Sequence, residues 1–473
     1  MTTQLSPQDL QNRTVLLEPD VVLLPEGPTQ GLGVMVQDGI FAEVADADTL
    51  RRQHPELSPL VLESTLLMPG FVDTHHHLTQ SFGKSMVFGE PSEIFRRVWV
   101  PMEGSLDEHT AYVASKLAAL ESLRGGFTAV CDAGTRMPVD VGAIASATVD
   151  VGIRCVLGKI CNDLEVDGST VDRDLVLSDA QQHLDRWAGA ELVHPSLAVS
   201  IPEAATSETL ASLAQLCRDQ GAVLQTHVNE HLAAVERSVE RTGRRPLEGL
   251  AEGGVLGPHA LLAHATLLTP YEVRLLRETD AAVSYNPVAS AWKGNAVAPA
   301  TTFAAEGIRF GIGTDGTRSD GFRLVDAAEM AQRLVYGIAT GNSSSGAGWT
   351  WLEHATSGGA SAAGLGGVTG TIATGYAADF LLVDLAVPEL TPSWDLGWEL
   401  VRLVNRDQIT AVVVGGRPRL WKGSPVDWDV EELLEEANQC AQKIAADAPI
   451  HIVHPTSQVH RATTLRTRHT EGH

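Results

Sequence analysis

The chain has 473 residues, of which 44% are hydrophobic and 20% are charged, a composition typical of a soluble globular protein with a large core. Its 59 acidic residues outnumber 34 basic ones, and the net charge of −25 argues against a nucleic-acid partner or an anionic membrane partner. No apolar run approaches the roughly 20 residues that cross a bilayer, and residues 1–5 do not begin a secretory signal. The five cysteines include no Cys-x-x-Cys pair, which favours reduced thiols in the cytoplasm.

The first predicted element is a β-hairpin near the N-terminus. Residues 34–44 are strand-like on both sides of Asp38-Gly39, the dipeptide that most often closes a two-residue hairpin. Far along the chain, residues 378–384 and 409–416 are again strand-like. We therefore expect residues 1–65 and 370–425 to form one small β-sandwich domain built from both chain ends.

Between residues 66 and 369, short apolar runs alternate with helix-like segments. Thr269 to Glu272, with Pro270 between them, and Ser105 to Glu108 have the pattern of capping boxes. Eight strand–helix units in sequence predict an α/β fold, a closed (β/α)8 TIM barrel, whereas a doubly wound open sheet is the alternative. We expect the strands near residues 66–77, 127–133, 154–162, 196–202, 222–229, 260–266, 281–287 and 308–315.

The last segment, residues 426–473, is expected to contain a helix over 428–447 and then a polar tail. The histidines of this tail are spread too widely for a single metal site, so we interpret the tail as solvated or in contact with another subunit. They are His451, His454, His460, His469 and His473.

The most informative motif is His75-His76-His77 at the end of the first barrel strand. Alternate side chains of a strand share a face, so His75 and His77 project together and His76 points away. Two neutral imidazoles at one strand end form half of a first-row metal site. By itself this pair is weak evidence, because such a spacing also occurs by chance.

Three further polar residues follow at the ends of later strands: His227, His264 and Asp315. Each alone is more often a packed histidine or a turn residue. In a barrel, however, the carboxyl ends of all strands face one shared mouth. His75, His77, His227 and Asp315 would then supply three nitrogens and one oxygen, a set that suits Zn²⁺ or Fe²⁺.

A divalent ion at such a site would make hydroxide available at neutral pH, and proton transfer then needs a separate group. Glu230 lies three residues beyond His227 and is the candidate proton shuttle, although a solvated glutamate at a helix start would look the same. His264 could polarise the electrophile or stabilise a developing oxyanion. Asp315 could also accept a proton from the attacking water.

Residues 78–104 form a long excursion after the first strand and contain Gln80 and Trp99. An excursion of this length suggests a lid over the site, although its apolar side chains fit local packing equally well. Lys293, after the seventh strand, could hold an acceptor on the substrate or lie on the surface. We take Gln80, Trp99, Asn286, Lys293 and Ser319 as candidate substrate-binding residues.

These motifs resemble the amidohydrolase superfamily, and most closely its mononuclear branch of triazine hydrolases, guanine deaminases and S-adenosylhomocysteine deaminases. Residues 69–73, 126–130, 355–360 and 375–379 extend the resemblance over nearly the whole chain. It implies one metal held by the residues that match His75, His77, His227 and Asp315. It also implies that Glu230 transfers protons and that His264 lies near the attacking water.

Binuclear relatives carry a carboxylated lysine on strand four, where this chain has none, since Lys159 lies on the third predicted strand. Three departures put the substrate in doubt. Ser200-Ile201-Pro202 lacks the histidine of many deaminases, Tyr285-Asn286-Pro287 has tyrosine where relatives often have histidine, and Ser319-Asp320 replaces a Ser-Asn pair. The resemblance thus specifies the metal chemistry better than the pocket.

We therefore predict a cytoplasmic metal-dependent hydrolase that deaminates a nitrogen heterocycle, of aminopurine, aminopyrimidine or triazine type, with a small molecule as its only substrate class. The alternative keeps the same site but hydrolyses an amide, urea or carbamate C–N bond. A non-catalytic barrel is disfavoured, because no expected ligand is missing. The resemblance also implies a homodimer or a larger homo-oligomer.

Overall fold

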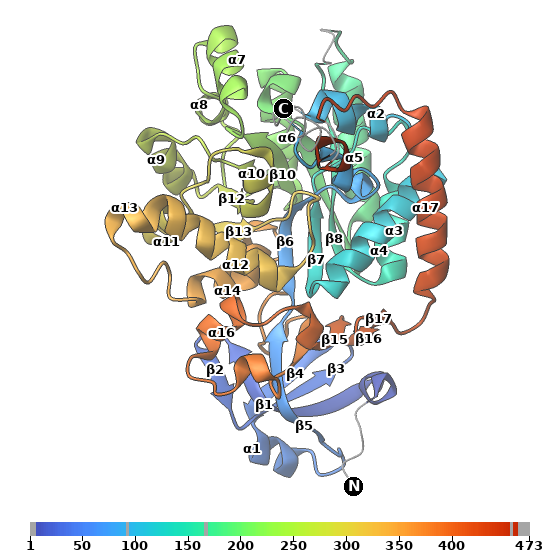
Figure 1. Cartoon of the computed structure of the whole chain (residues 1–473), viewed down its shortest axis with the longest axis vertical. Helices are drawn as coiled ribbons and strands as arrows, with labels where there is room; N and C mark the ends of the chain where they lie inside the picture. Colours follow the sequence, from blue (N-terminus) through green and yellow to red (C-terminus); the bar gives the residue numbers. More distant parts are fainter. Residues whose placement is uncertain (1–5, 91–93, 165–168, 455–456, 462–473) are drawn as a thin grey trace, which may run out of the picture.

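The computed structural model describes residues 6–90, 94–164, 169–454 and 457–461. The N-terminal residues 1–5 and the predicted tail histidines His469 and His473 lie outside these ranges. Two sheets organise the chain: a closed parallel barrel and a separate mixed sheet, which lie one above the other in Figure 1. Among the described residues, no helix is both long enough and apolar enough to span a membrane.

The predicted TIM barrel is confirmed, and all eight of its strands pair in parallel. It closes between its last and first strands, where Ile312 pairs with Asp73. In chain order the strands are β6 (Phe71–His76), β7 (Phe127–Asp132), β8 (Arg154–Ile160), β9 (Val193–Val199), β10 (Val223–Val228), β11 (Ala260–His264), β12 (Ala282–Tyr285) and β13 (Phe310–Ile312).

Helices follow each strand, and many of them lie around the outside of the barrel (Figure 1). They are α3 (Glu108–Arg124), α4 (Gly142–Val151), α5 (Arg173–Trp187), α6 (Ser207–Gln220), α7 (Leu232–Thr242), α8 (Pro246–Glu252), α9 (Pro270–Thr279), α10 (Pro287–Lys293), α11 (Ala300–Glu306), α12 (Gly321–Gln332), α13 (Ile338–Thr340), α14 (Trp349–Ala355) and α15 (Ser357–Ala362). The predicted C-terminal helix is confirmed as α17 (Val430–Asp447), which packs along α3.

The run predicted as one strand over 66–77 is divided between the two sheets. Strand β5 (Leu60–Pro69) pairs with strands of the mixed sheet, and β6 starts the barrel at Phe71. The chain crosses at Gly70, where an added Cβ would lie 2.1 Å from the Thr128 side chain. The apolar run is continuous because both strands are buried, so its composition did not reveal the break.

The second sheet joins the two chain ends, as predicted. Its nine strands run in the order β17-β16-β15-β14-β5-β1-β3-β4, with β2 paired to β1. The predicted hairpin is confirmed around Asp38-Gly39, both of which have positive φ as its turn requires. The strands other than β5 are β1 (Thr14–Leu24), β2 (Gly27–Gln30), β3 (Leu32–Gln37), β4 (Ile40–Asp46), β14 (Phe380–Asp384), β15 (Ile409–Val414), β16 (Arg417–Trp421) and β17 (Ser424–Pro425). This unit also carries α1 (Ala47–Gln53), and α16 (Leu396–Arg402) lies between β14 and β15 in the chain.

One of the two predicted capping boxes is confirmed and the other is wrong. Thr269 and Glu272 cap α9 reciprocally, with Pro270 in its first turn. Helix α3 is capped instead by Asp107 and Thr110. Ser105 does not cap this helix because its hydroxyl donates to the carbonyl of Pro101 in the preceding turn.

The excursion after β6 consists of short helical turns at the mouth of the barrel. They are η2 (Leu78–Gln80), η3 (Lys84–Val87), η4 (Phe95–Trp99) and α2 (Val100–Glu103). The beginning of the C-terminal tail packs on this excursion: the amide of His451 donates to the carbonyl of Arg97, and the amide of His454 donates to the buried carboxylate of Glu90. This part of the tail therefore packs on the protein itself rather than lying free in solvent.

Candidate active site

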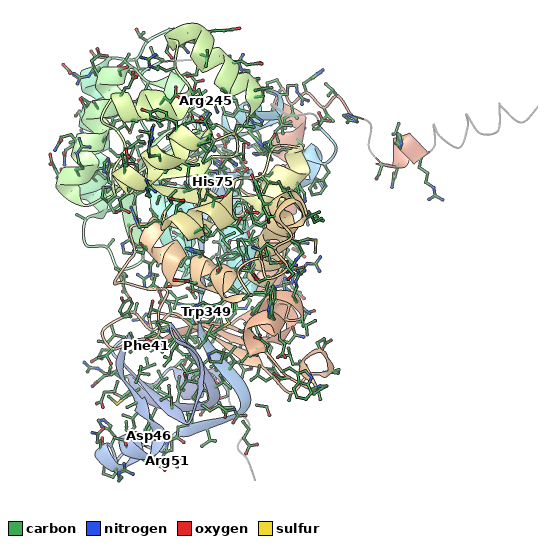
Figure 2. The ribbon with its side chains drawn as sticks, turned by 90° about the vertical axis from the view of Figure 1, so that its left-hand side faces the viewer. Phe41, Asp46, Arg51, His75, Arg245 and Trp349 are labelled. Atoms are coloured by element: carbon green, nitrogen blue, oxygen red, sulfur yellow. The ribbon has the colours of Figure 1, made fainter. Side chains whose placement is uncertain are left out.

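The four predicted metal ligands meet at the carboxyl ends of the barrel strands. His75 and His77 come from β6 and the residue after it, His227 from β10, and Asp315 from the turn after β13. One donor atom from each lies within 4.8 Å of the others. Figure 2 places His75 within the barrel body, well apart from Phe41 of β4 and Arg51 of α1.

The protonation pattern of these imidazoles suits a cation. His227 Nδ1 lies 2.7 Å from the carbonyl oxygen of Ser200 and must donate to it, so its Nε2 keeps a free lone pair. That Nε2 lies 3.2 Å from His77 Nε2, and the buried His75 Nε2 makes no hydrogen bond within the described part of the chain. Burial, reinforced by His75, holds the pKa of His77 and of His227 well below the ordinary value.

A carboxylate completes the cluster. Asp315 Oδ1 lies 3.3 Å from His75 Nε2 and 3.4 Å from His77 Nε2. Three imidazole nitrogens and one carboxylate oxygen that converge in a buried space form the donor set expected for a first-row divalent ion. The residues present therefore fit the predicted metal.

Two buried aspartates that the sequence reasoning did not assign hold this cluster in place. Asp73 accepts hydrogen bonds from the backbone amide and from the hydroxyl of Thr314, the residue before Asp315. Asp132 accepts from the amide of Leu78, directly after His77. The register of β6 against β7 shifts between Asp73 and His76, so strand alternation alone does not place Asp73.

Glu230 lies beside the cluster, as its position after β10 predicted. Lys293 Nζ donates to Glu230 Oε1 at 2.9 Å and to Asp315 Oδ2 at 2.5 Å, and His231 Nε2 lies 3.2 Å from Glu230 Oε2. Burial alone would raise the pKa of Glu230. The combined effect of His264, Lys293 and His231 outweighs burial and holds that pKa well below its ordinary value, so the side chain is a carboxylate at neutral pH.

His264 faces the same space, and a chain of hydrogen bonds behind it sets its tautomer. Ser284 Oγ donates to Asn286 Oδ1 at 2.9 Å, which leaves the Asn286 amide nitrogen to donate to His264 Nδ1 at 3.3 Å. The proton of His264 is therefore on Nε2, 3.7 Å from Glu230 Oε1 and 3.8 Å from Asp315 Oδ2. Its φ of +72° is rare for a residue with a side chain, and such backbone strain gathers at functional sites.

A cavity of about 150 Å³ opens onto His77, His227, Glu230 and Asp315. Of the predicted substrate-binding residues, Gln80, Trp99 and Lys293 line it. Phe95 of the expected lid also lines it, whereas the sequence did not point to several other residues of its wall: Ile94, Arg96, Arg136, Glu203 and Arg237. A larger groove lies on the mixed sheet, but none of the residues that line it belongs to the cluster above.

Asn286 and Ser319 do not line this cavity. Asn286 is buried behind His264, as described above, so it contacts a candidate catalytic residue rather than the cavity. Ser319 Oγ lies 3.1 Å from His76 Nε2, on the opposite side of β6 from His75 and His77. Strand alternation predicted the outward direction of His76, and Ser319 shares that outward environment.

Comparison with known proteins gives consistent matches. Residues 66–419 match the model of the amidohydrolase family. Two relatives similar along the chain are a 5'-deoxyadenosine deaminase of Methanosarcina mazei, 26% identical over 92% of this chain and 98% of its own length, and a 5-methylthioadenosine/S-adenosylhomocysteine deaminase of Moorella thermoacetica, 28% identical over 90% of this chain and 99% of its own length.

Two solved structures support the same fold. An adenosine deaminase from Xanthomonas campestris with bound zinc superposes with a TM-score of 0.83 at 24% identity and covers 91% of this chain and 98% of its own. An atrazine chlorohydrolase from Arthrobacter aurescens in complex with zinc gives a TM-score of 0.79 at 20% identity and covers 90% of this chain and 100% of its own.

Proposed function

The chain belongs to the amidohydrolase family, and we propose that it is an aminohydrolase that replaces the exocyclic amino group of an adenine-type ring with hydroxyl and releases ammonia. The observation that carries this proposal is the meeting of Glu230, His264 and Asp315 in one group beside the imidazole cluster. The Glu230 carboxylate can accept a proton and the His264 N–H can donate a hydrogen bond, both beside the imidazole cluster. The two relatives described above carry the names of adenine-nucleoside deaminases, which supports the ring substrate.

We propose that His75, His77, His227 and Asp315 hold one divalent ion, with Zn²⁺ as the first choice and Fe²⁺ as the alternative. Three imidazole nitrogens and one carboxylate oxygen favour these ions, and the zinc in two structural neighbours agrees. A second ion is not expected, because strand β9 supplies no lysine and Lys159 lies on β8. When bound, the ion acidifies water and so supplies hydroxide at neutral pH.

The chain's own groups move the protons. The Glu230 carboxylate accepts the proton that water loses as its oxygen attacks the ring carbon. It then returns a proton to the amino nitrogen, so that the C–N bond breaks with ammonia as the leaving group. His264 donates its Nε2–H to the charge that develops during attack. Lys293, bonded to both Glu230 and Asp315, keeps these carboxylates ionised and at a fixed separation.

We further propose a cytoplasmic enzyme that acts on small molecules as a homodimer or a larger homo-oligomer. Its net charge of −25 supports a partner other than nucleic acid or membrane. An exposed apolar stripe over α12 and the residues after it suits contact between subunits. It contains Met330, Leu334, Val335 and Ile338.

The test is a substrate screen with metal-quantified protein, in which ammonia is measured separately from organic amines. The panel contains adenine nucleosides, aminopurines, aminopyrimidines, triazines and phenylureas. Ammonia from an amino-substituted ring is the expected product. Aniline or an alkylamine from the ureas, with no ammonia from any ring, would replace the proposal with hydrolysis of an amide or urea bond.

A further inference from the structure

Among the described residues of the cavity wall, Glu203 is the one acidic residue that belongs neither to the imidazole cluster nor to the proton-transfer group. Its Oε1 is buried and has no hydrogen-bond partner within the described part of the chain. A buried carboxylate oxygen without a partner is costly, and native structures usually satisfy such an atom with protein, water or ligand. Its position in the wall makes a ligand the natural partner.

The backbone holds Glu203 in place. It lies in the short turn η5 (Pro202–Ala204), and the amide of Leu164 donates to the carbonyl of Ala204 at 3.1 Å. On the other side, Ser200 exchanges hydrogen bonds with Asn162, whose amide nitrogen donates to Ser200 Oγ at 2.9 Å. The carboxylate therefore projects from a segment fixed at both ends rather than from a free loop.

The backbone connection from Ser200 to Glu203 also limits the distance between Glu203 and the imidazole cluster. The carbonyl of Ser200 accepts the hydrogen bond from His227 Nδ1, and Glu203 follows three residues later. Three residues span at most roughly 10 Å. Glu203 is therefore near enough to the cluster to contact a substituent of a ring whose reacting carbon lies there, but it is not part of the cluster.

The surrounding charges indicate what this carboxylate binds. Arg96 and Arg237 line the same cavity, together with Lys293 and Arg136, whose charges are matched by Glu230, Asp315 and Glu103. An ammonium group on the substrate would therefore meet added positive charge from Arg96 and Arg237. A neutral hydrogen-bond donor avoids this repulsion. A pair of adjacent hydroxyl groups matches the two oxygens of a carboxylate, and O–H···O⁻ bonds are short and strong.

We propose that Glu203 binds the vicinal hydroxyl groups of a sugar attached to the reacting ring, so that the enzyme selects ribonucleosides over free bases and deoxynucleosides. This inference rests on the proposed ring deamination and extends it to a second part of the substrate. Glu203 is then a specificity-determining residue that contacts substrate but transfers no proton.

The test compares kcat/KM for adenosine and for 2',3'-dideoxyadenosine in three proteins: the native chain, Glu203→Gln, and Glu236→Gln as a matched control on the exposed side of α7. The native enzyme should prefer adenosine by about tenfold to a hundredfold, the range expected for loss of hydrogen bonds to a charged group. Glu203→Gln should reduce this preference to less than about threefold, because kcat/KM falls much more for adenosine than for the dideoxynucleoside, and the metal content should stay near native. Glu236→Gln should behave like the native enzyme.

An unchanged preference in Glu203→Gln would overturn the assignment, and so would an equal loss on both substrates. If that variant does not fold, the native enzyme still decides: equal kcat/KM for adenosine and the dideoxynucleoside overturns the proposal. Turnover of free aminopurines or triazines without turnover of nucleosides would remove the sugar site but leave ring deamination intact. Absence of ammonia from every ring would instead overturn the proposed function itself.

Discussion

Asn286 determines which nitrogen of His264 carries the proton. Its amide can donate to His264 Nδ1 only because Ser284 Oγ already donates to its oxygen, and Ser284 Oγ lies 2.7 Å from Thr74 Oγ1. These hydrogen-bonded side chains are all buried, and the series ends at His264, which faces the imidazole cluster. A change at Asn286 should therefore affect chemistry without touching the proposed metal ligands.

We expect Asn286→Asp to lower kcat by about 10- to 100-fold with little change in KM or metal content. A carboxylate can only accept from His264 Nδ1, so the proton moves to Nδ1 and Nε2 no longer donates into the site. Steady-state kinetics and elemental analysis of the same sample measure both effects. A variant with native kcat would show that the tautomer of His264 does not matter.

Glu230→Gln tests the proton shuttle directly. Glutamine keeps the shape and an acceptor for Lys293 but cannot take up a proton, so we expect kcat to fall by about a hundredfold or more. The metal content should stay near native, because the ligand atoms of the cluster come from other residues. Glu240→Gln, at an exposed position of α7, is the control and should be native in rate. An unaltered kcat in Glu230→Gln would exclude Glu230 from the mechanism.

At this scale the sequence predicted the residues whose direction follows from strand geometry. His75, His77, His227 and Asp315 lie at strand ends, and all strand ends of a barrel face one mouth. The direction of Asn286 and Ser319 depends on hydrogen-bond partners far away in the chain, His264 and His76, which no local pattern encodes. Glu203 was missed for a similar reason, since only the cavity gives it a role.

At the scale of elements, the start of the C-terminal tail packs on the excursion between β6 and α3. Glu90 is 5% exposed and accepts hydrogen bonds from the amides of Val453 and His454, while Arg97 bonds to both Glu90 and the backbone of His451. The same excursion supplies Phe95 and Trp99 to the cavity wall. The tail thus holds part of the wall in place.

Removal of residues 451–473 should raise KM several-fold and leave kcat and metal content near native. Glu90 loses backbone donors, so the excursion becomes less ordered. Substrate binding must then order it, and the larger loss of conformational entropy weakens binding. Limited proteolysis should also cut the excursion faster than in the intact chain. A control that ends after Arg461 keeps these contacts and should resemble the full chain; a KM within twofold of native in the shorter protein would contradict this role.

The sequence located most elements because apolar runs and capping residues are local signals. It could not divide residues 66–77 into two strands, since β5 and β6 are both buried and the division at Gly70 is visible only through its contact with Thr128. It also could not show that the tail folds back on the excursion. That contact joins segments more than 350 residues apart and uses mainly backbone groups.

For the whole molecule, buried neutral histidines make stability depend on pH. Burial lowers the pKa of His183, His194 and His354 to about 4 in the folded protein. In the unfolded chain a histidine has a pKa of about 6.5, so below this pH the unfolded state binds more protons than the folded state. Stability is therefore fully present above pH 6.5 and is lost progressively as the pH falls toward 4.

We expect His354→Asn to weaken this pH dependence. His354 Nδ1 donates to the carbonyl of Phe310 at 3.0 Å, and the asparagine amide can make the same bond without titrating. Between pH 7.5 and 5 the native chain should lose about 2 kcal/mol more unfolding free energy than the variant. Urea unfolding at both pH values measures the difference; an identical loss in the two proteins would show that His354 does not contribute.

The most direct test of the central claim is to measure metal content and ammonia release together in one sample while Zn²⁺ is removed and returned. We predict that ammonia release from an adenine-type substrate disappears with the metal and returns fully at one equivalent of Zn²⁺ per chain. We also predict that His227→Ala, which lacks one proposed ligand, fails to recover at that stoichiometry. Undiminished ammonia release by metal-free protein would contradict the account.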